Sequence, residues 1–244
     1  MLRAVTFDFW NTLFVDALGR EREKRRVAIL AAALEAAGHT ATPRALDEAL
    51  RASWDHFDRV WSREHRTPLC DELVGAILAT LGVSLPEAIR RPLISDFERL
   101  VIDIPPEPTP GAVYTMPLLA ERYRLAVICD TGYSPGSVLR EILEHHGMLA
   151  HFEYTYFSGE HGMSKPDVRV FRHVLDELGV AAGEAAHVGD IQRTDVAGAQ
   201  AAGLAAVHFI GANSKDAARS TGDVLLRHFD DLPRALGGLT CAGC

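Results

Sequence analysis

Short apolar segments that end in polar residues recur along the chain and alternate with helical patterns. Residues 2–7, 125–129, 185–188 and 204–209 are predicted to be buried strands, because each run is too short for a helix and stops at an aspartate, a glycine or a polar turn. Apolar residues at helical spacing predict helices over residues 137–146, 168–178 and 195–202. Strands that alternate with helices favour right-handed βαβ units, so we predict an α/β fold with a parallel sheet.

Residues 15–104 differ from the rest of the chain, because they carry helical periodicity and no convincing strand pattern. The periodic segments are residues 22–37, 43–61, 71–81 and 86–100. The block ends at the proline-rich stretch IPPEPTPG, residues 104–111, whose composition is typical of a stiff hinge. We therefore predict an all-helical domain, residues 15–104, inserted into an α/β core made of residues 1–14 and 105–244.

Composition argues against several classes of partner. Hydrophobic residues make up 48% of the 244 residues, which is ample for a core, and the formal net charge is −8. No basic block dominates, so nucleic acid is not an expected partner. In residues 20–26, basic side chains are interspersed with Glu21 and Glu23, which predicts a solvated helix face.

Neither a membrane segment nor a disulfide framework is expected. No apolar run approaches the roughly 20 residues of a membrane span, and Asp8 interrupts the N-terminal run too early for a signal peptide. Cys241 and Cys244 form a lone CxxC without a second ligand pair, which favours a frayed tail over a zinc site. These features predict a soluble cytoplasmic protein.

Polar residues capable of chemistry follow the predicted strands. Asp8 ends the first strand, Thr131 follows the second, and Asp190 follows the third with Asp195 five residues later. Lys165 lies just ahead of a predicted helix. Ligands of open parallel sheets bind beyond the carboxyl ends of the strands, so we expect these five side chains to converge.

Convergent carboxylates repel one another unless a cation neutralises them. Ligation by oxygen alone suits magnesium, which binds through one or two carboxylates together with phosphate oxygens. A lysine then offers a compact positive charge to a phosphate. A carboxylate, a divalent cation, a lysine and a hydroxyl are the parts of phosphoryl transfer through an aspartyl-phosphate.

Four motifs occur in order along the chain: FDFWNT, CDTG, SKPD and GDIQRTD. With them the chain resembles the haloacid dehalogenase (HAD) superfamily, most of whose members are magnesium-dependent phosphatases. The resemblance implies a Rossmann-like core, and the helical block sits where many members carry a helical cap. It also implies a small phosphorylated metabolite as substrate.

The resemblance also implies roles for individual residues. Asp8 would be the nucleophile and a metal ligand, the backbone carbonyl of Trp10 a second ligand, and Asp190 a third. Asp195 would bind the metal directly or through water, and Lys165 would steady Asp8 and the phosphate. The phosphate would be held by residues of the first three motifs: Thr12, Cys129, Asp130, Thr131, Gly132 and Lys165.

Two positions depart from the family pattern. Phosphatases of the family usually carry a second aspartate two residues after the nucleophile, which protonates the leaving oxygen and later activates water. Trp10 occupies this position and cannot transfer a proton, whereas such general acid–base help is typically worth about 10²–10⁴-fold in rate. In the second motif, the usual hydroxyl position is Cys129; Thr131 is favoured to take over its role, and the alternative is that Cys129 leaves the role unfilled.

Four other residues are candidates for the missing acid–base role: His161, His56, His65 and Asp16. A structural role is favoured for each. His187 and His208 lie in strand patterns and are predicted to be core residues. Trp54, Phe57 and Trp61 share one helix face, which is more typical of a helical core than of a substrate platform. Trp10 is either core packing at the mouth of the site or a wall against the substrate.

Three functions remain open from the sequence. The first is a magnesium-dependent phosphohydrolase that forms an aspartyl-phosphate at Asp8 and turns over good leaving groups best, such as acyl or aryl phosphates. The second is a 2-haloacid dehalogenase, in which Asp8 attacks carbon and displaces halide; the family's dehalogenases carry a tyrosine at the position of Trp10. The third is a catalytically weak or non-catalytic member that binds a phosphate ligand or a protein partner. A homodimer is possible in each case.

Overall fold

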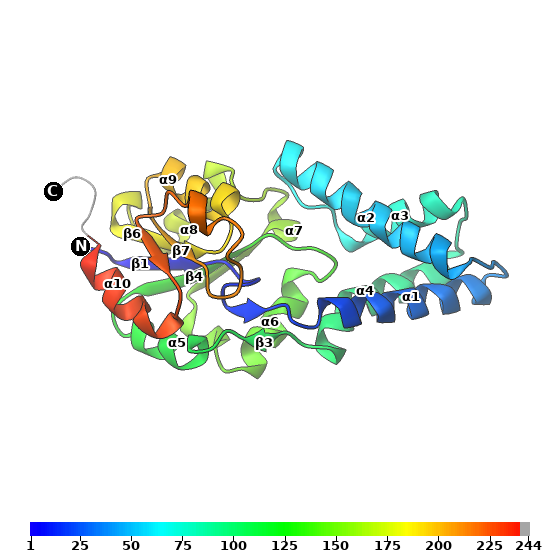
Figure 1. Ribbon diagram of the computed structural model, residues 1–244, viewed down its shortest axis with the longest axis horizontal. Helices are drawn as coiled ribbons and strands as arrows, with labels where there is room; N and C mark the ends of the chain where they lie inside the picture. Colours follow the sequence, from blue (N-terminus) through cyan, green and yellow to red (C-terminus); the bar gives the residue numbers. More distant parts are fainter. Residues whose placement is uncertain (240–244) are drawn as a thin grey trace.

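Six parallel strands form a sheet in one half of the molecule (Figure 1). The computed structural model describes residues 1–239. The strand order is β5 (Tyr154–Phe157), β4 (Arg124–Cys129), β1 (Ala4–Phe7), β6 (Ala185–Gly189), β7 (Ala205–Phe209) and β8 (Val224–Leu226). The four central strands are the four predicted from the sequence, which confirms a parallel α/β fold. The edge strands β5 and β8 were not predicted.

Helices cover both faces of the sheet, and the alternation of buried side chains along the strands explains why. Val5 and Phe7 of β1 belong to a hydrophobic cluster with α5 (Ala112–Ala120), α6 (Gly136–His145) and α10 (Leu232–Gly238). Ala4 belongs to a second cluster, with α8 (Val168–Leu178) and α9 (Ala197–Ala202). Successive strand residues point to opposite faces, so β1 is buried on both sides.

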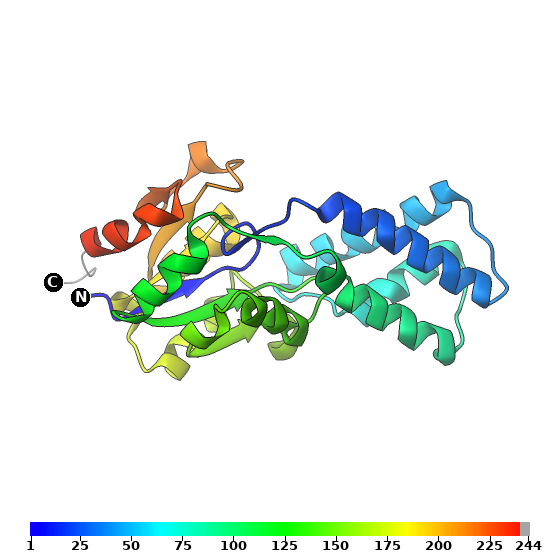
Figure 2. The same ribbon diagram turned by 90° about the horizontal axis from the view of Figure 1, so that it is seen from below.

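Four helices make up the other half of the molecule: α1 (Gly19–Ala36), α2 (Pro43–Glu64), α3 (Cys70–Leu81) and α4 (Glu87–Asp103). They share a separate hydrophobic cluster that includes Leu30, Phe57, Leu73 and Phe97. Figure 2 shows them side by side, beyond the end of the sheet. The four helices therefore pack around one hydrophobic cluster, which Tyr133 joins from outside residues 15–104, and the division into two domains stays a prediction.

Two adjacent chain segments connect the halves. Strand β2 (Phe14–Val15) pairs antiparallel with β3 (Glu107–Pro108), and the amide of Thr109 donates to the carbonyl of Leu13 at 2.9 Å. The proline-rich stretch predicted as a hinge thus contains one strand of a short ribbon. Within residues 1–239, no helix combines the length and apolar character needed to cross a membrane. The predicted frayed tail with Cys241 and Cys244 lies outside the described residues.

Candidate active site

Asp8 follows directly after β1, and a tight turn sets the residues beyond it. The amide of Asp8 donates to the carbonyl of Val188 at 2.9 Å, which fixes the backbone against β6. Asn11 has a φ of 55°, in the left-handed region that asparagine tolerates better than most residues, and its amide donates to the carbonyl of Phe14 at 2.6 Å. The turn holds Trp10 at the same cavity as Asp8.

Lys165 joins two of the predicted carboxylates. Its Nζ donates to Asp8 Oδ1 at 2.6 Å, to Asp195 Oδ1 at 2.7 Å and to the carbonyl of Ile128 at 2.9 Å. Its side chain is only 2% exposed. Burial opposes the charged form, but the attraction of Asp195 and Asp8 is greater in sum and raises the pKa of Lys165 well above its usual value. The ammonium ion therefore stays charged, with three acceptors for its three protons.

Both carboxylate oxygens of Asp195 accept hydrogen bonds from protein donors. It lies in a π-helical turn, Gln192–Val196, a rare geometry that occurs frequently at functional sites. Besides Lys165, it accepts from the amide of Ile191 at 2.9 Å and lies 3.2 Å from His187 Nε2. Burial alone would raise the pKa of Asp195, but Lys165 and His187 outweigh it and lower that pKa.

Gly189 makes room for Asp195 at the end of β6. A Cβ at position 189 would lie 2.4 Å from the Asp195 side chain, closer than any real contact. The glycine is therefore required by the approach of the carboxylate to the strand.

Asp190 has a different environment. Its Oδ2 accepts from Asn213 Nδ2 at 2.7 Å, while burial and then the charge of Asp195 raise the pKa of Asp190 to about 7. Burial likewise raises the pKa of Asp8, against the pull of Lys165 and with the help of Asp195 and Asp190. Lys165 pairs with Asp8 and Asp195 but not with Asp190, so the three carboxylates outnumber the one ammonium ion of the cluster.

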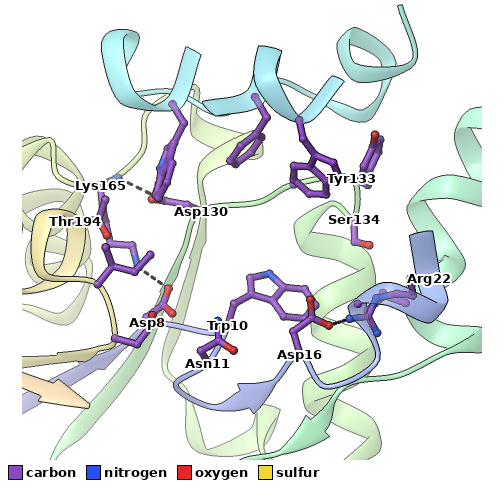
Figure 3. Close-up of a pocket in the computed structure, with 18 of the residues that line it drawn as sticks. Asp8, Trp10, Asn11, Asp16, Arg22, Asp130, Tyr133, Ser134, Lys165 and Thr194 are labelled. Atoms are coloured by element: carbon purple, nitrogen blue, oxygen red, sulfur yellow. Dashed lines mark hydrogen bonds and ion pairs between the residues drawn. The ribbon is translucent and has the colours of Figure 1, made fainter. Parts of the chain in front are cut away.

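A cavity of about 260 Å³ opens above this cluster, between the sheet and the helical insertion. In Figure 3, Asp8 and Lys165 lie at one end, Trp10 in the middle, and Asp16 with Arg22 at the other end. Its lining includes five aromatic side chains, Trp10, Trp54, Phe57, Trp61 and Tyr133, and nine charged ones, among them Asp8, Asp16, Arg22, Glu23, Arg26, Asp130 and Lys165. Asp190 and Asp195 also line it, so four of the five predicted residues meet here.

Thr131 is the exception among those five. Its Oγ1 accepts from the amide of Gly159 at 3.1 Å and lies within hydrogen-bonding distance of the Ser158 and Thr67 hydroxyls, at 3.2 and 3.4 Å. Thr67 belongs to the loop between α2 and α3, so this cluster joins the insertion to the sheet. Thr131 is not among the residues that line the cavity.

The other residues of the first two motifs divide between cavity and core. Cys129 is fully buried in the core, where burial and then Asp8 raise the pKa of its thiol, so it stays neutral. Thr12 is also fully buried and does not line the cavity. Asp130 and Gly132 do line it; Asp130 accepts from the Lys165 amide at 3.0 Å and from Trp61 Nε1 at 2.8 Å, and burial raises its pKa to about 6.

The basic segment of α1 is solvated only in part: Arg20, Glu21, Lys24 and Arg25 are exposed as predicted, but two arginines are not. Arg22 and Arg26 are 3% and 6% exposed and line the cavity. Arg22 pairs with Asp16, and Arg26 Nη1 donates to Glu23 Oε1 at 2.6 Å. Both arginines lie in register with Leu30 and Leu34 at four-residue spacing, a signal in the sequence that they share the buried face.

The histidines weighed for the acid–base role lie elsewhere. The ring of His161 stacks on Tyr156 with centroids 4.3 Å apart, His56 pairs with Arg59, and neither lines the cavity. His65 does not line it either, whereas Asp16 does. His187 and His208 are buried in strands as predicted.

Two carboxylates have an oxygen left for a cation. Within residues 1–239, no three His, Cys, Asp or Glu side chains form a cluster able to hold a metal ion. No protein donor in that range is recorded on Asp8 Oδ2 or Asp190 Oδ1, whereas both oxygens of Asp195 are engaged. Two carboxylates and a backbone carbonyl suit magnesium, which keeps several of its waters.

The cavity thus has a lysine-paired carboxylate at the end of a central strand, beneath the helices α1–α4. The model of the haloacid dehalogenase-like hydrolases matches residues 2–203, and the chain belongs to this family. It is 46% identical over 88 residues to a phosphoserine phosphatase of Thermus thermophilus, and 38% identical over 80 residues to haloacid dehalogenase-like hydrolase domain-containing protein 3 of mouse. These matches span only about a third of this chain and of each relative.

Solved structures show the same fold over nearly the whole chain. A 2-haloacid dehalogenase of Pseudomonas syringae superposes with a TM-score of 0.74 at 22% identity, over 97% of this chain and 99% of that one. A HAD phosphatase of Thermococcus onnurineus gives 0.70 at 21% identity, over 97% and 99%. Phosphatases and dehalogenases thus share this architecture, and the reaction has to be argued from the site.

Proposed function

We propose that the protein is a magnesium-dependent phosphohydrolase that acts on a small phosphorylated metabolite through an aspartyl-phosphate at Asp8. The observation that carries this proposal is the Asp8–Lys165 contact of 2.6 Å at the base of a cavity whose carboxylates outnumber its ammonium ion. Relatives with phosphatase names agree with it. Such an excess of carboxylates calls for a cation, which the magnesium ion of a phosphohydrolase would supply.

Asp8 acts as the nucleophile. One of its oxygens attacks phosphorus, the bond from phosphorus to the leaving oxygen breaks, and an aspartyl-phosphate forms. Water then attacks phosphorus, the bond to Asp8 breaks, and inorganic phosphate leaves. Lys165 bonds Asp8 Oδ1 and so orients the carboxylate, and its charge also attracts the phosphate.

The donor set fits a magnesium ion. Asp8, Asp190 and the backbone carbonyl of Trp10 would hold it, with Asp195 acting through water because its oxygens are engaged by protein donors. When bound, the ion supplies positive charge that offsets the carboxylates and the phosphate oxygens. Thr131 as the phosphate-binding hydroxyl stays a prediction, since in this arrangement its side chain bonds Ser158 and Gly159.

Residues 15–104 act as a cap that covers the site and excludes water. Trp61 reaches from α2 to Asp130, and Arg193 lies over the Trp61 ring at 4.3 Å from its centroid. The carbonyl of His65 accepts from the amide of Ser164, next to Lys165, at 2.7 Å. Closure of such lids commonly gates substrate entry and product release.

A phosphate panel with and without magnesium tests the proposal. Phosphate release should require magnesium, should be lost in Asp8→Asn, and should persist in Asp231→Asn, which changes an exposed carboxylate at the start of α10 in the same way. Turnover that does not need magnesium, or survives in Asp8→Asn, contradicts the proposal.

The dehalogenase function is the second candidate, and Trp10 favours it. Its ring lines the cavity near Asp8, and halide leaves without a proton, so a tryptophan in place of an acid costs nothing there. Chloride release from 2-chloropropionate without magnesium, with no phosphate release from the panel, would establish this candidate in place of the first.

A further inference from the structure

We infer that the substrates of this site are aryl phosphates, whose uncharged aromatic ring occupies the aromatic part of the cavity. The inference rests on the proposed phosphohydrolase function and adds the chemical class of the leaving group. It is carried by two independent features: the aromatic wall of the cavity and the residue at position 10.

The wall comes from both halves of the molecule. Trp54, Phe57 and Trp61 on α2 face the cavity together with Trp10 and Tyr133, which follow strands of the sheet. The rings brace one another: Trp54 meets Tyr133 edge-on with centroids 5.1 Å apart, and meets Phe57 at 5.5 Å. Figure 3 shows Trp10 between the Asp8 end and the Arg22 end, so a ring attached to a phosphate at Asp8 would lie beside it.

Three of the four polar atoms of this wall are engaged by the protein itself, and the fourth, Trp10 Nε1, makes no hydrogen bond within residues 1–239. Trp54 Nε1 donates to Glu23 at 3.0 Å, Trp61 Nε1 donates to Asp130 at 2.8 Å, and the Tyr133 hydroxyl bonds the Ser53 hydroxyl. Apart from that one N–H, what the wall offers a ligand is therefore ring faces and edges. Against these rings a flat aromatic ligand would gain aromatic contacts, whereas the hydroxyls of a sugar or polyol would find partners only where Asn11, Ser134, Asp16 and Glu23 line the cavity.

The charges at the far end are already paired. Asp16 pairs with Arg22, and Glu23 pairs with Arg26. The Arg26 guanidinium also stacks over the Tyr133 ring, 4.3 Å from its centroid. Because each pair is neutral overall, this end of the cavity offers no unbalanced charge to a ligand. The ring of the substrate is therefore uncharged.

The residue at position 10 selects the same class by a different argument. The indole N–H of Trp10 is not acidic enough to transfer its proton, so the leaving oxygen departs with the electron pair of its bond to phosphorus and takes a proton from solvent afterwards. A phenol has a pKa of about 10, as tyrosine does, against about 15.7 for water. An aryloxide is therefore a far better leaving group than an alkoxide when no acid is present.

Binding of non-hydrolysable phosphonates gives a test without turnover. All three tryptophans of the chain line the cavity, so tryptophan fluorescence reports on it directly. With magnesium present, phenylphosphonate should bind more tightly than methylphosphonate and perturb the emission. Equal affinities, or tighter binding of methylphosphonate, overturn the inference.

Turnover gives the second test and separates the two proposals. Phenyl phosphate should have a higher kcat/KM than glycerol 1-phosphate, and a lower KM than acetyl phosphate, which has a good leaving group but no ring. No turnover of any of them with magnesium contradicts the proposed function, whereas a preference for glycerol 1-phosphate, or a KM for phenyl phosphate no lower than that for acetyl phosphate, contradicts only the aryl class.

Variants of Trp54 test whether the aromatic wall causes the preference for phenyl phosphate. Trp54→Leu should raise KM for phenyl phosphate by roughly 2- to 12-fold, the range of one aromatic pair, and leave acetyl phosphate almost unchanged. Trp54→Phe keeps a ring and should stay close to wild type, which also serves if the leucine variant does not fold. Tyr114→Leu, an exposed aromatic on α5, is the matched control. Equal effects of Trp54→Leu on both substrates would refute a ring-binding role.

Discussion

Replacement of Lys165 by methionine should destabilise the protein strongly at neutral pH. Lys165 is 2% exposed, and its ammonium ion is the positive partner of Asp8 and Asp195 at 2.6 and 2.7 Å. Removal of one member of a buried ion pair costs about 3–5 kcal/mol, because a buried charge is left uncompensated. A typical domain has only about 5–15 kcal/mol of total stability, so the unfolding curve should shift plainly.

Urea unfolding followed by circular dichroism measures the effect, without metal and at two pH values. The loss should be smaller at pH about 5 than at pH about 7, because the orphaned carboxylates can take up protons at the lower pH. Lys215→Met, which removes an exposed lysine, is the control and should change little.

A double variant sharpens the interpretation. Lys165→Met combined with Asp195→Asn removes one charge of each sign, and should recover part of the stability lost in the single variant. A single-variant loss no greater than that of Lys215→Met, or a double variant with no recovery, would refute the argument that this cluster depends on Lys165 for its charge balance.

Three further changes follow from the same geometry. Trp10→Asp restores a proton donor and removes a ring, so turnover of glycerol phosphate should rise by about 10²-fold while turnover of phenyl phosphate rises less. Initial rates with magnesium measure both, and an unchanged ratio of the two rates contradicts the role given to Trp10. Gly189→Ala forces a Cβ against Asp195 and should cost about 1–3 kcal/mol in thermal unfolding, and an unchanged midpoint would show that the strand end can relax. Burial raises the pKa of Asp130 from 3.8 to about 6, so its contribution to stability is present below pH about 4 and is lost as pH rises through about 6. The free energy of unfolding should change by up to about 3 kcal/mol on this account. Unfolding measured across that pH range should show the change in the wild type and not in Asp130→Asn.

The central strands and the charged cluster could be predicted because their signals are local. A short apolar run that ends in Asp8, or in Gly189 and Asp190, marks both a strand and the residues at its carboxyl end. The edge strand β5 was missed because Thr155 and two tyrosines interrupt its apolar pattern. The π-helical turn around Asp195 was missed because a single inserted residue leaves no periodic signal.

The cavity wall was harder to predict, since it depends on how the insertion packs against the sheet. Trp54, Phe57 and Trp61 were predicted to be the core of the helical block, and they do belong to its cluster, but the same rings also line the cavity. Arg22 and Arg26 were assigned to solvent because the residues between them are charged. Only the fold reveals that their face of α1 turns toward the site.

Detection of the covalent intermediate tests the central claim most directly. The protein is mixed with magnesium and phenyl phosphate, quenched in acid, digested, and the peptide that contains Asp8 is weighed by mass spectrometry. The proposed reaction predicts a phosphoryl group on Asp8 in the wild type and none in Asp8→Asn. Phosphate release without that adduct, or an adduct on another residue, would contradict the proposal that Asp8 is the nucleophile.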